Sequence, residues 1–147
     1  LALRNKNYDI LGIDISQKAI NVAMKNKNNL ENITFLKMDI LNQIPDGKFD
    51  IIISNPPYIP LIDLSRISKD VKEYEPMIAL TDQADGLTFY KRYMKIAYDI
   101  LAHDGKVLLE VGLNTHPFKV KKIFIEKGFS DVKLIKDLNG DNRFILA

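Results

Sequence analysis

The sequence contains no cysteine among its 147 residues. Disulfide bonds, thiolate metal sites and a cysteine nucleophile are therefore excluded, and we expect a protein of a reducing, cytoplasmic compartment. An excess of charge of one sign is also lacking, because 21 Lys and Arg residues stand against 19 Asp and Glu, a formal net charge of +2. This balance gives no reason to expect a nucleic-acid partner or a membrane surface.

Long apolar runs are missing as well. None approaches the roughly 20 residues that a bilayer span needs, so we expect no membrane partner. With 46% hydrophobic residues, the chain is long enough for one domain that buries roughly two-thirds of its unfolded surface. We therefore expect residues 1–147 to form a single domain. Because Leu1 is not a natural start, we also expect that an upstream part is missing.

The most informative stretch is an apolar run, residues 49–54, that stops at Asn55, Pro56, Pro57 and Tyr58. The run predicts a buried strand. Each proline fixes its own φ, lacks an N–H and pushes the preceding residue toward extended backbone. The carbonyl oxygens of Asn55 and Pro56, and the Asn55 side chain, can therefore accept hydrogen bonds from a planar N–H₂ group. From these four residues alone, an ordinary strand-ending turn is an equally good interpretation.

The order of the expected elements predicts an open, mostly parallel α/β sheet. We expect strands at residues 8–13, 33–38, 49–54, 106–111, 131–136 and 143–147, and helices at 16–27, 87–101 and 117–127. Asn139-Gly140 predicts a turn between the last two strands, which would make a C-terminal antiparallel hairpin. We expect residues 61–84 to be a long loop with one short helix.

Polar residues stand at the carboxyl ends of four expected strands: Asp14, Asp39, Asn55 and Glu110. Ligands of open α/β sheets bind outside these ends, so the four residues define a candidate site. Asp14 could instead help to cap the helix that follows, and Asp39 could start a turn.

The two histidines do not belong to this candidate site. His103 and His116 flank expected helices. We expect both to be surface residues.

The chain resembles S-adenosylmethionine-dependent methyltransferases that modify planar amino or amide nitrogens, and in particular the release-factor glutamine-N5 methyltransferases (HemK/PrmC family). The resemblance rests on these segments: Gly12-Ile13-Asp14, Ser54-Asn55-Pro56-Pro57-Tyr58-Ile59, Tyr74-Glu75-Pro76 with Ala79-Leu80, Leu108-Leu109-Glu110 with Gly112, and Asp137 with Gly140-Asp141-Asn142-Arg143. Asn-Pro-Pro-Tyr alone is shared with adenine-N6 methyltransferases. The Glu-Pro segment and the Gly-Asp-Asn-Arg segment favour the glutamine family.

The resemblance implies a Rossmann-like methyltransferase fold and methyl transfer from S-adenosylmethionine to the side-chain N5 of a glutamine in peptide chain release factors, leaving S-adenosylhomocysteine and using no metal. It implies that Asp14 binds the cofactor ribose and that Asp39 lies near the adenine amino group. Asn55, Pro56, Pro57 and Tyr58 would form the substrate site. The implied catalytic residues are Asn55, Pro56 and Tyr58, with Asn55 also beside the cofactor. Glu75, Glu110 and Arg143 match family positions without an assigned role.

The family's glycine-rich cofactor loop has no counterpart among the seven glycines of this chain. That loop brings backbone N–H groups close to the cofactor. We expect it upstream of Leu1, together with the family's central first strand and its N-terminal helical domain, so the chain would be the truncated C-terminal part of a catalytic domain. Two rival interpretations are an adenine-N6 nucleic-acid methyltransferase and a non-catalytic fragment or pseudoenzyme.

Overall fold

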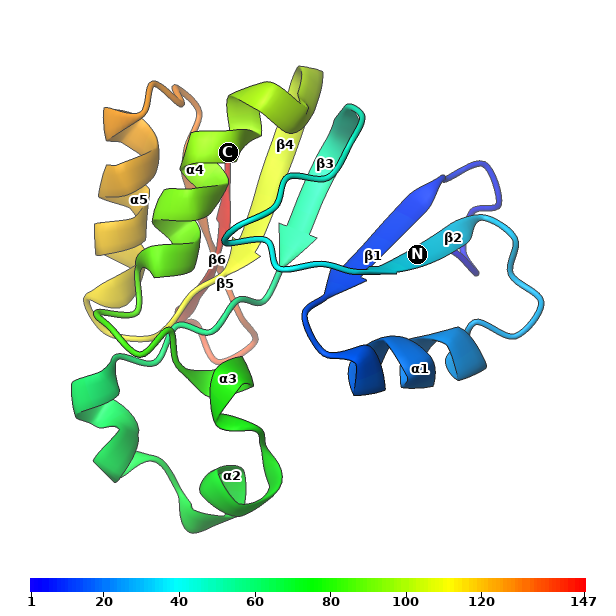
Figure 1. Cartoon of the computed structure of the whole chain (residues 1–147). Coiled ribbons are helices and arrows are strands. Elements are labelled where there is room, and N and C mark those ends of the chain that lie inside the picture. The colour runs from blue at the N-terminus through cyan, green and yellow to red at the C-terminus, as the bar shows by residue number, and fades with distance from the viewer. The chain divides into compact units, whose positions relative to one another are not determined.

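The computed structural model describes the backbone of residues 1–147 and every side chain except that of Lys72. The chain divides into two compact units, Leu1–Pro45 and Asp46–Ala147. Each unit has its own sheet, with two strands in the first and four in the second (Figure 1).

The first unit is a β-α-β unit. It consists of β1 (Ile10–Asp14), α1 (Gln17–Asn26) and β2 (Ile33–Lys37). The two strands are parallel, and Asp14 pairs with Lys37 at their carboxyl ends. Helix α1 begins where the sequence predicts, because the Ser16 hydroxyl accepts a hydrogen bond from the Ala19 N–H at 3.3 Å.

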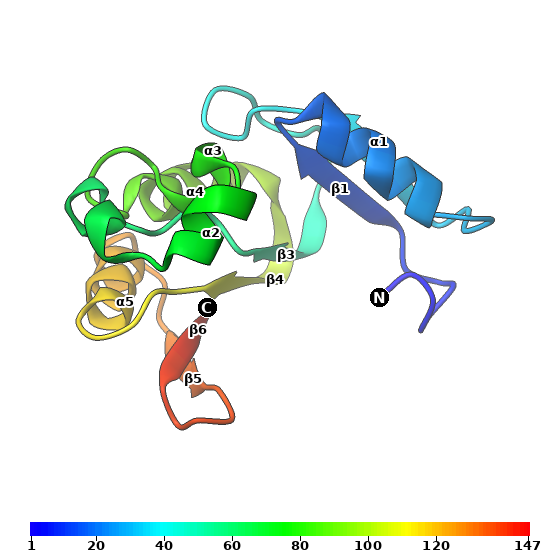
Figure 2. The ribbon, with the colours of Figure 1, turned by 90° about the horizontal axis from the view of Figure 1, so that it is seen from below.

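The second unit has a four-stranded sheet with the order β3-β4-β6-β5. Its strands are β3 (Phe49–Ser54), β4 (Leu101–Glu110), β5 (Lys133–Lys136) and β6 (Asn142–Leu146). β3 and β4 are parallel, whereas β6 is antiparallel to both of its neighbours. Two helices, α4 (Thr88–Ile100) and α5 (His116–Glu126), lie on one face of this sheet (Figures 1 and 2). The predicted α/β fold with parallel strands and a C-terminal antiparallel hairpin is confirmed.

Three short helices, instead of one, connect β3 to α4. They are the 3-10 helix η1 (Leu61–Arg66), α2 (Lys69–Tyr74) and α3 (Met77–Leu80). Segments of four to six residues are too short to show a helical period in the sequence, which is why the prediction of a loop with one helix was wrong.

Helix α4 fixes the carboxyl ends of two strands through buried tyrosines. The Tyr93 hydroxyl donates to Ser54 Oγ at the end of β3 (2.8 Å), and the Tyr90 hydroxyl donates to the Glu110 carbonyl at the end of β4 (2.7 Å). Both side chains are buried, and burial raises the pKa of each phenol. The predicted broadly buried helix is therefore confirmed, and it also positions the sheet edge where the candidate site begins.

No residue of β3 is fully buried, so the prediction of a buried strand was wrong: one face of the strand is half-buried and the other is exposed. Because Ser54 faces α4, Ile52 faces the same way, and Ile51 and Ile53 face the opposite side. Ile51 and Ile53 are 47% and 50% exposed. β3 is an edge strand of its sheet, which an apolar sequence alone does not reveal.

Candidate active site

The chain turns at Asn55, immediately after β3. Asn55 is exposed, Pro56 is buried, and Pro57 and Tyr58 are half-buried. Within the described part of the chain, no hydrogen bond reaches the Asn55 amide side chain or the Pro56 carbonyl oxygen. Neither acceptor is therefore occupied by a hydrogen-bond donor of the described residues.

The segment after Tyr58 is fastened to residues 80–86. The Ile59 N–H donates to the Leu80 carbonyl and the Leu61 N–H to the Ala84 carbonyl, each at 3.0 Å. Gly86, with φ of +78°, passes so close that a Cβ there would collide with the Tyr58 carbonyl oxygen. The turn at residues 55–58 therefore rests against a second loop.

Asp82 organises this second loop. Its carboxylate accepts the backbone N–H groups of Ala84, Gly86 and Thr88 at 2.9–3.0 Å. Burial acts to raise the pKa of Asp82, but these hydrogen bonds outweigh it and hold the pKa below its usual range. The backbone that supports Tyr58 is thereby held by an ionised side chain.

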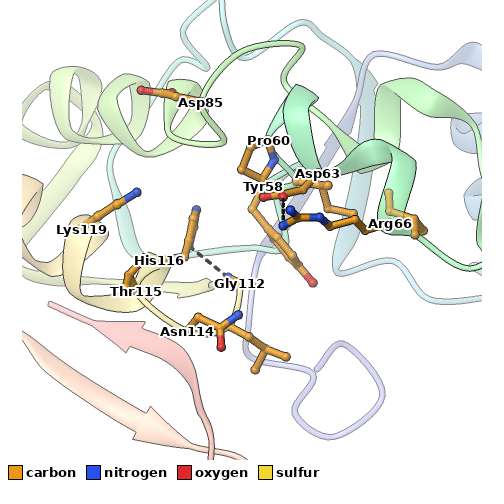
Figure 3. A pocket seen from close by; sticks show the side chains of 13 residues that line it. Tyr58, Pro60, Asp63, Arg66, Asp85, Gly112, Asn114, Thr115, His116 and Lys119 are labelled. Atoms are coloured by element: carbon orange, nitrogen blue, oxygen red, sulfur yellow. Dashed lines mark hydrogen bonds and ion pairs between the residues drawn. The ribbon is translucent and has the colours of Figure 1, made fainter.

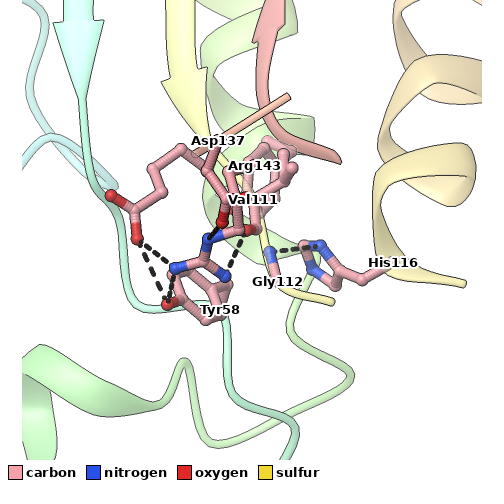
Figure 4. Close-up of polar contacts among 8 residues, drawn as sticks. Tyr58, Val111, Gly112, His116, Asp137 and Arg143 are labelled. Carbon is pink, nitrogen blue, oxygen red and sulfur yellow. Dashed lines mark hydrogen bonds and ion pairs between the residues drawn. The ribbon is translucent and has the colours of Figure 1, made fainter. Parts of the chain in front are cut away.

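The Tyr58 hydroxyl is bound between a carboxylate and a guanidinium. It donates to Glu110 Oε1 at 3.3 Å and accepts from Arg143 Nη2 at 3.4 Å. Arg143 Nη2 also lies 2.9 Å from Glu110 Oε1, and its Cζ is 5.9 Å from the Tyr58 ring centroid (Figure 4). The hydrogen bond with Tyr58, together with the charge of Glu110, raises the pKa of Arg143. Residues 58, 110 and 143 thus meet at one point.

Arg143 is itself held by two further groups. Its Nη1 donates to the Val111 carbonyl at 3.1 Å, and its Nε lies 3.8 Å from Asp137 Oδ2. Asp137 also accepts the N–H groups of Asn139 and Asp141, which closes the β5–β6 turn. The sequence marked Asp137 and Arg143 only by family resemblance, because the contacts of Arg143 with Val111 and Tyr58 cross 32 and 85 residues of chain.

His116 lies beside Tyr58, contrary to the prediction of a surface residue. Its Nδ1 accepts the Gly112 N–H at 3.1 Å, and its Nε2 lies 3.0 Å from the Gly86 carbonyl. This pair of contacts requires the neutral ring with the proton on Nε2. The ring centroid lies 5.9 Å from that of Tyr58 and 5.2 Å from that of Tyr90. No local sequence pattern signals contacts of this kind.

His103 is exposed, as predicted. Its side chain is 96% exposed and lies 2.9 Å from the Asp104 carboxylate. The chain therefore offers one internal histidine and one surface histidine for comparison.

We expect His116 to make stability depend on pH. Burial lowers the pKa of its ring below the ordinary value of about 6.5 that holds in the unfolded chain. The unfolded state therefore binds more protons as the pH falls below about 6.5, and the free energy of unfolding decreases there. Above that pH, the neutral His116 ring makes its full contribution to the free energy of unfolding. Denaturant unfolding at about pH 7.5 and 5.5 should show a smaller decrease for His116→Gln than for the wild type.

His103→Gln is the matched control for this pH dependence, because that ring is exposed. The free energy of unfolding of His103→Gln should decrease on acidification by as much as that of the wild type. If both variants lose the same stability on acidification as the wild type, His116 does not contribute to it.

A pocket opens beside Tyr58, with a volume of about 420 Å³ (Figure 3). It is lined by Tyr58, Ile59, Pro60, Asp63, Arg66, Ile67, Asp85, Gly112, Leu113, Asn114, Thr115, His116 and Lys119. Side chains of both signs lie around it, and Arg66 Nη1 is 3.0 Å from Asp63 Oδ1. This mixture of apolar, polar and oppositely charged groups is compatible with a neutral, polar chain segment, and the volume is typical of a ligand pocket.

The first unit holds the two predicted cofactor carboxylates at one sheet edge. The Met38 N–H donates to the Asp14 carbonyl at 2.9 Å, so β2 ends beside β1. Asp14 is exposed, and its Oδ1 accepts the Ser16 N–H at 2.7 Å. Both oxygens of Asp39 are bonded locally, to the Leu41 N–H and the Asn42 side chain. Each residue therefore has the local role that the sequence allowed as an alternative.

The convergence of Asp14 and Asp39 with Asn55 remains a prediction, because these residues belong to different units. Glu75, at the end of α2, is exposed. Across the described residues, no group of three or more His, Cys, Asp and Glu side chains is arranged to hold a metal ion. None of the described helices has the length and apolar character needed to cross a membrane.

A family model described as "Methyltransferase domain" matches residues 1–122. The chain belongs to this methyltransferase domain family. This methyltransferase domain is 39% identical over 145 residues to the release factor glutamine methyltransferase of Fusobacterium nucleatum, a match that covers 97% of the chain and 41% of the relative. The family resemblance seen in the motifs is thereby confirmed. The chain spans about half the length of the curated relatives it matches.

Solved structures show the same fold for the methyltransferase domain. A methyltransferase from Pyrococcus furiosus matches 99% of this chain and 66% of its own, with a TM-score of 0.68 and 20% identity. The N-methyltransferase NodS from Bradyrhizobium japonicum, in complex with S-adenosyl-L-homocysteine, matches 93% of this chain and 63% of its own, with a TM-score of 0.54 and 18% identity. The predicted methyltransferase fold is confirmed.

Proposed function

We propose that this chain is part of an enzyme that transfers a methyl group from S-adenosylmethionine to the side-chain N5 of a glutamine in peptide chain release factors. The observation that carries the proposal is the exposed Asn55 side chain at the end of β3, without a hydrogen bond to any described residue and directly followed by two prolines and a held tyrosine. The names of the curated relatives support the choice of substrate.

The substrate amide binds to Asn55 Oδ1 and the Pro56 carbonyl oxygen, which accept its two N–H groups. An amide nitrogen is a poor nucleophile because its lone pair is delocalised into the carbonyl. Two fixed acceptors orient the nitrogen and would stabilise the positive charge that develops on it as it takes the methyl group; the nitrogen becomes neutral again when one of its two N–H protons leaves. Pro57 keeps this turn stiff, and the face of Tyr58 packs beside the amide.

The cofactor carboxylates in this proposal are Asp14 and Asp39, with Asn55 beside them. Asp14 fits the role because it is exposed at the end of β1 and only one of its oxygens is bonded locally. It would accept the ribose hydroxyls, and Asp39 would lie near the adenine amino group. When bound, S-adenosylmethionine supplies an electrophilic methyl group on a sulfonium, and S-adenosylhomocysteine is the product. The proposal includes no metal.

We also propose that the two units belong to one catalytic domain, residues 1–147. The family model supports this, because its match over residues 1–122 runs across both units. The edge position of β3 is compatible with a further strand paired with it in the whole protein, and the half-exposed side chains of Ile51 and Ile53 are compatible with a further element packed on that face.

The full-length protein, given S-adenosylmethionine with a labelled methyl group, should label a peptide chain release factor on one glutamine. Mass spectrometry should place the methyl group on the side-chain nitrogen. Replacing that glutamine by leucine should abolish labelling. Labelling that persists without the glutamine would contradict the proposal.

Two further measurements distinguish the rival functions. Label in DNA or RNA instead of the release factor would favour an adenine-N6 methyltransferase that acts on a flipped base. Calorimetry in which the full-length protein does not bind S-adenosylmethionine would favour a pseudoenzyme.

A further inference from the structure

We infer that Glu110 and Arg143 are positioning residues. They hold the ring of Tyr58 in place beside the position where the substrate amide would bind, next to Asn55 and Pro56. The inference rests on the proposed function, since it assigns a task to Tyr58 beside Asn55. It gives a role to the Glu110 and Arg143 positions, which the sequence left without one.

The Tyr58 hydroxyl is used both as a hydrogen-bond donor and as an acceptor within the protein. Its only proton is donated to Glu110 Oε1, and Arg143 Nη2 donates to its oxygen. A phenol in this state has no proton left for a substrate and is bound to a cation at its oxygen. Tyr58 therefore contributes the face of its ring and its position, and proton transfer is not its task.

The ring is confined as tightly as the hydroxyl. A Cβ added to Gly112 would lie 3.2 Å from Tyr58 Cδ2 and 3.3 Å from His116 Cγ, so a glycine at 112 lets the chain approach both rings. The His116 ring is held in turn by Gly112 and Gly86. Contacts at the hydroxyl, the ring and the backbone hold Tyr58 in the orientation that Figure 4 shows.

Stabilising the fold is a poor explanation for the ion pair itself. The side chains of Arg143 and Glu110 are only 22% and 23% exposed, and the net contribution of a largely buried ion pair to stability is small, because the cost of desolvating both charges offsets their attraction. The planar guanidinium instead fixes directions, since it reaches Glu110, Tyr58 and Val111 at once. The hydrogen bonds of Arg143 and Glu110 with the Tyr58 hydroxyl therefore fix the position of the Tyr58 ring.

A double-mutant cycle in the full-length protein tests this role. Glu110→Gln keeps the shape of the side chain and removes its charge, and Tyr58→Phe removes the hydroxyl through which Glu110 acts. We expect Glu110→Gln to lower kcat by about 10-fold to 100-fold, because a misplaced group costs rates of this order. In the Tyr58→Phe background, Glu110→Gln should have little further effect. An equal loss in both backgrounds would overturn the inference.

Arg143→Lys extends the cycle, because lysine keeps the charge and loses the planar fork. It should show the same dependence on the Tyr58 hydroxyl. Glu126→Gln is the matched control and should retain wild-type kcat, because Glu126 is an exposed carboxylate on α5 whose ion-pair partner among the described residues is Lys122.

A readout without turnover separates this inference from the proposed function. In NMR spectra of ring-labelled tyrosine, the nuclear Overhauser contacts of the Tyr58 ring with Gly112 and His116 should be strong in the wild type and should weaken in Glu110→Gln and Arg143→Lys. If Tyr58 keeps its wild-type behaviour in both variants, the inference fails even when glutamine methylation is found. If the ring is released but no glutamine is methylated by the wild type, the proposed function fails and the positioning of Tyr58 stands.

Discussion

The Asn55→Ala variant is expected to lower kcat for glutamine methylation by about 10²–10³, the usual loss when one preorganised hydrogen-bonding group is removed from a reaction site. Asn55 Oδ1 is one of the two acceptors that would orient the substrate nitrogen, and the Pro56 carbonyl cannot hold both N–H groups in the same geometry. Initial rates at saturating S-adenosylmethionine and release factor measure the effect.

The fold should survive this substitution, because Asn55 is exposed and its side chain makes no hydrogen bond to a described residue. Asn29→Ala, at another exposed asparagine, is the matched control and should retain full activity. A kcat within a few-fold of wild type for Asn55→Ala would remove Asn55 from the mechanism. An equal loss in Asn29→Ala would point to a general effect of substitution.

The Gly86→Ala variant is expected to have a free energy of unfolding lower by about 2–5 kcal/mol, from backbone strain and overpacking together. Gly86 has φ of +78°, and an added Cβ would collide with the Tyr58 carbonyl oxygen and lie 3.3 Å from Pro60 Cγ. Because the obstacle is backbone, it cannot rotate away. Denaturant unfolding measures the loss, and methyl transfer should fall with it as Tyr58 is displaced.

Gly140→Ala separates strain from collision. Its φ of +88° is similar, but no atom lies within 4 Å of the added Cβ. The free energy of unfolding of Gly140→Ala should then fall only by the cost of backbone strain, about 1–2 kcal/mol. If Gly86→Ala loses no more stability than Gly140→Ala, the close contact between Gly86 and Tyr58 does not exist in solution.

The elements that the sequence predicts well are those in which local chemistry decides. Ser16 is an N-cap because its hydroxyl reaches an N–H three residues on, which needs no tertiary contact. The long apolar pattern of α4 and the turn at Asn139-Gly140 are equally local. The six strands follow from short apolar runs between such signals, but β4 begins at Leu101, five residues before the expected strand.

The features that the sequence does not predict depend on contacts far along the chain. His116 occupies an ordinary helix start, and only the fold brings Gly86 to its ring. Ile51 and Ile53 are apolar, yet their face of β3 is exposed and the other face is only half-buried. The three helices of residues 61–80 are too short for periodicity to show.

The candidate site also has a part that local sequence predicts and a part that depends on contacts between distant segments. The end of β3 before Asn55 and Pro56 follows from the covalent geometry of proline, so an irregular segment there was predictable from a few residues, and its role in binding an amide stays a prediction. The contacts of Glu110 and Arg143 with Tyr58 join segments 52 and 85 residues apart. Family resemblance marked those positions, but only the folded chain shows what each one touches.

The central claim is that Asn55 and Pro56 together hold a planar amide for methylation. The most direct measurement is a crystal structure of the full-length protein with S-adenosylhomocysteine and a glutamine-containing peptide of a release factor. We predict that the glutamine side-chain nitrogen lies about 3 Å from both Asn55 Oδ1 and the Pro56 carbonyl oxygen, with the Tyr58 ring beside it. A glutamine bound elsewhere, with the Asn55 side chain turned away from it, would contradict the claim.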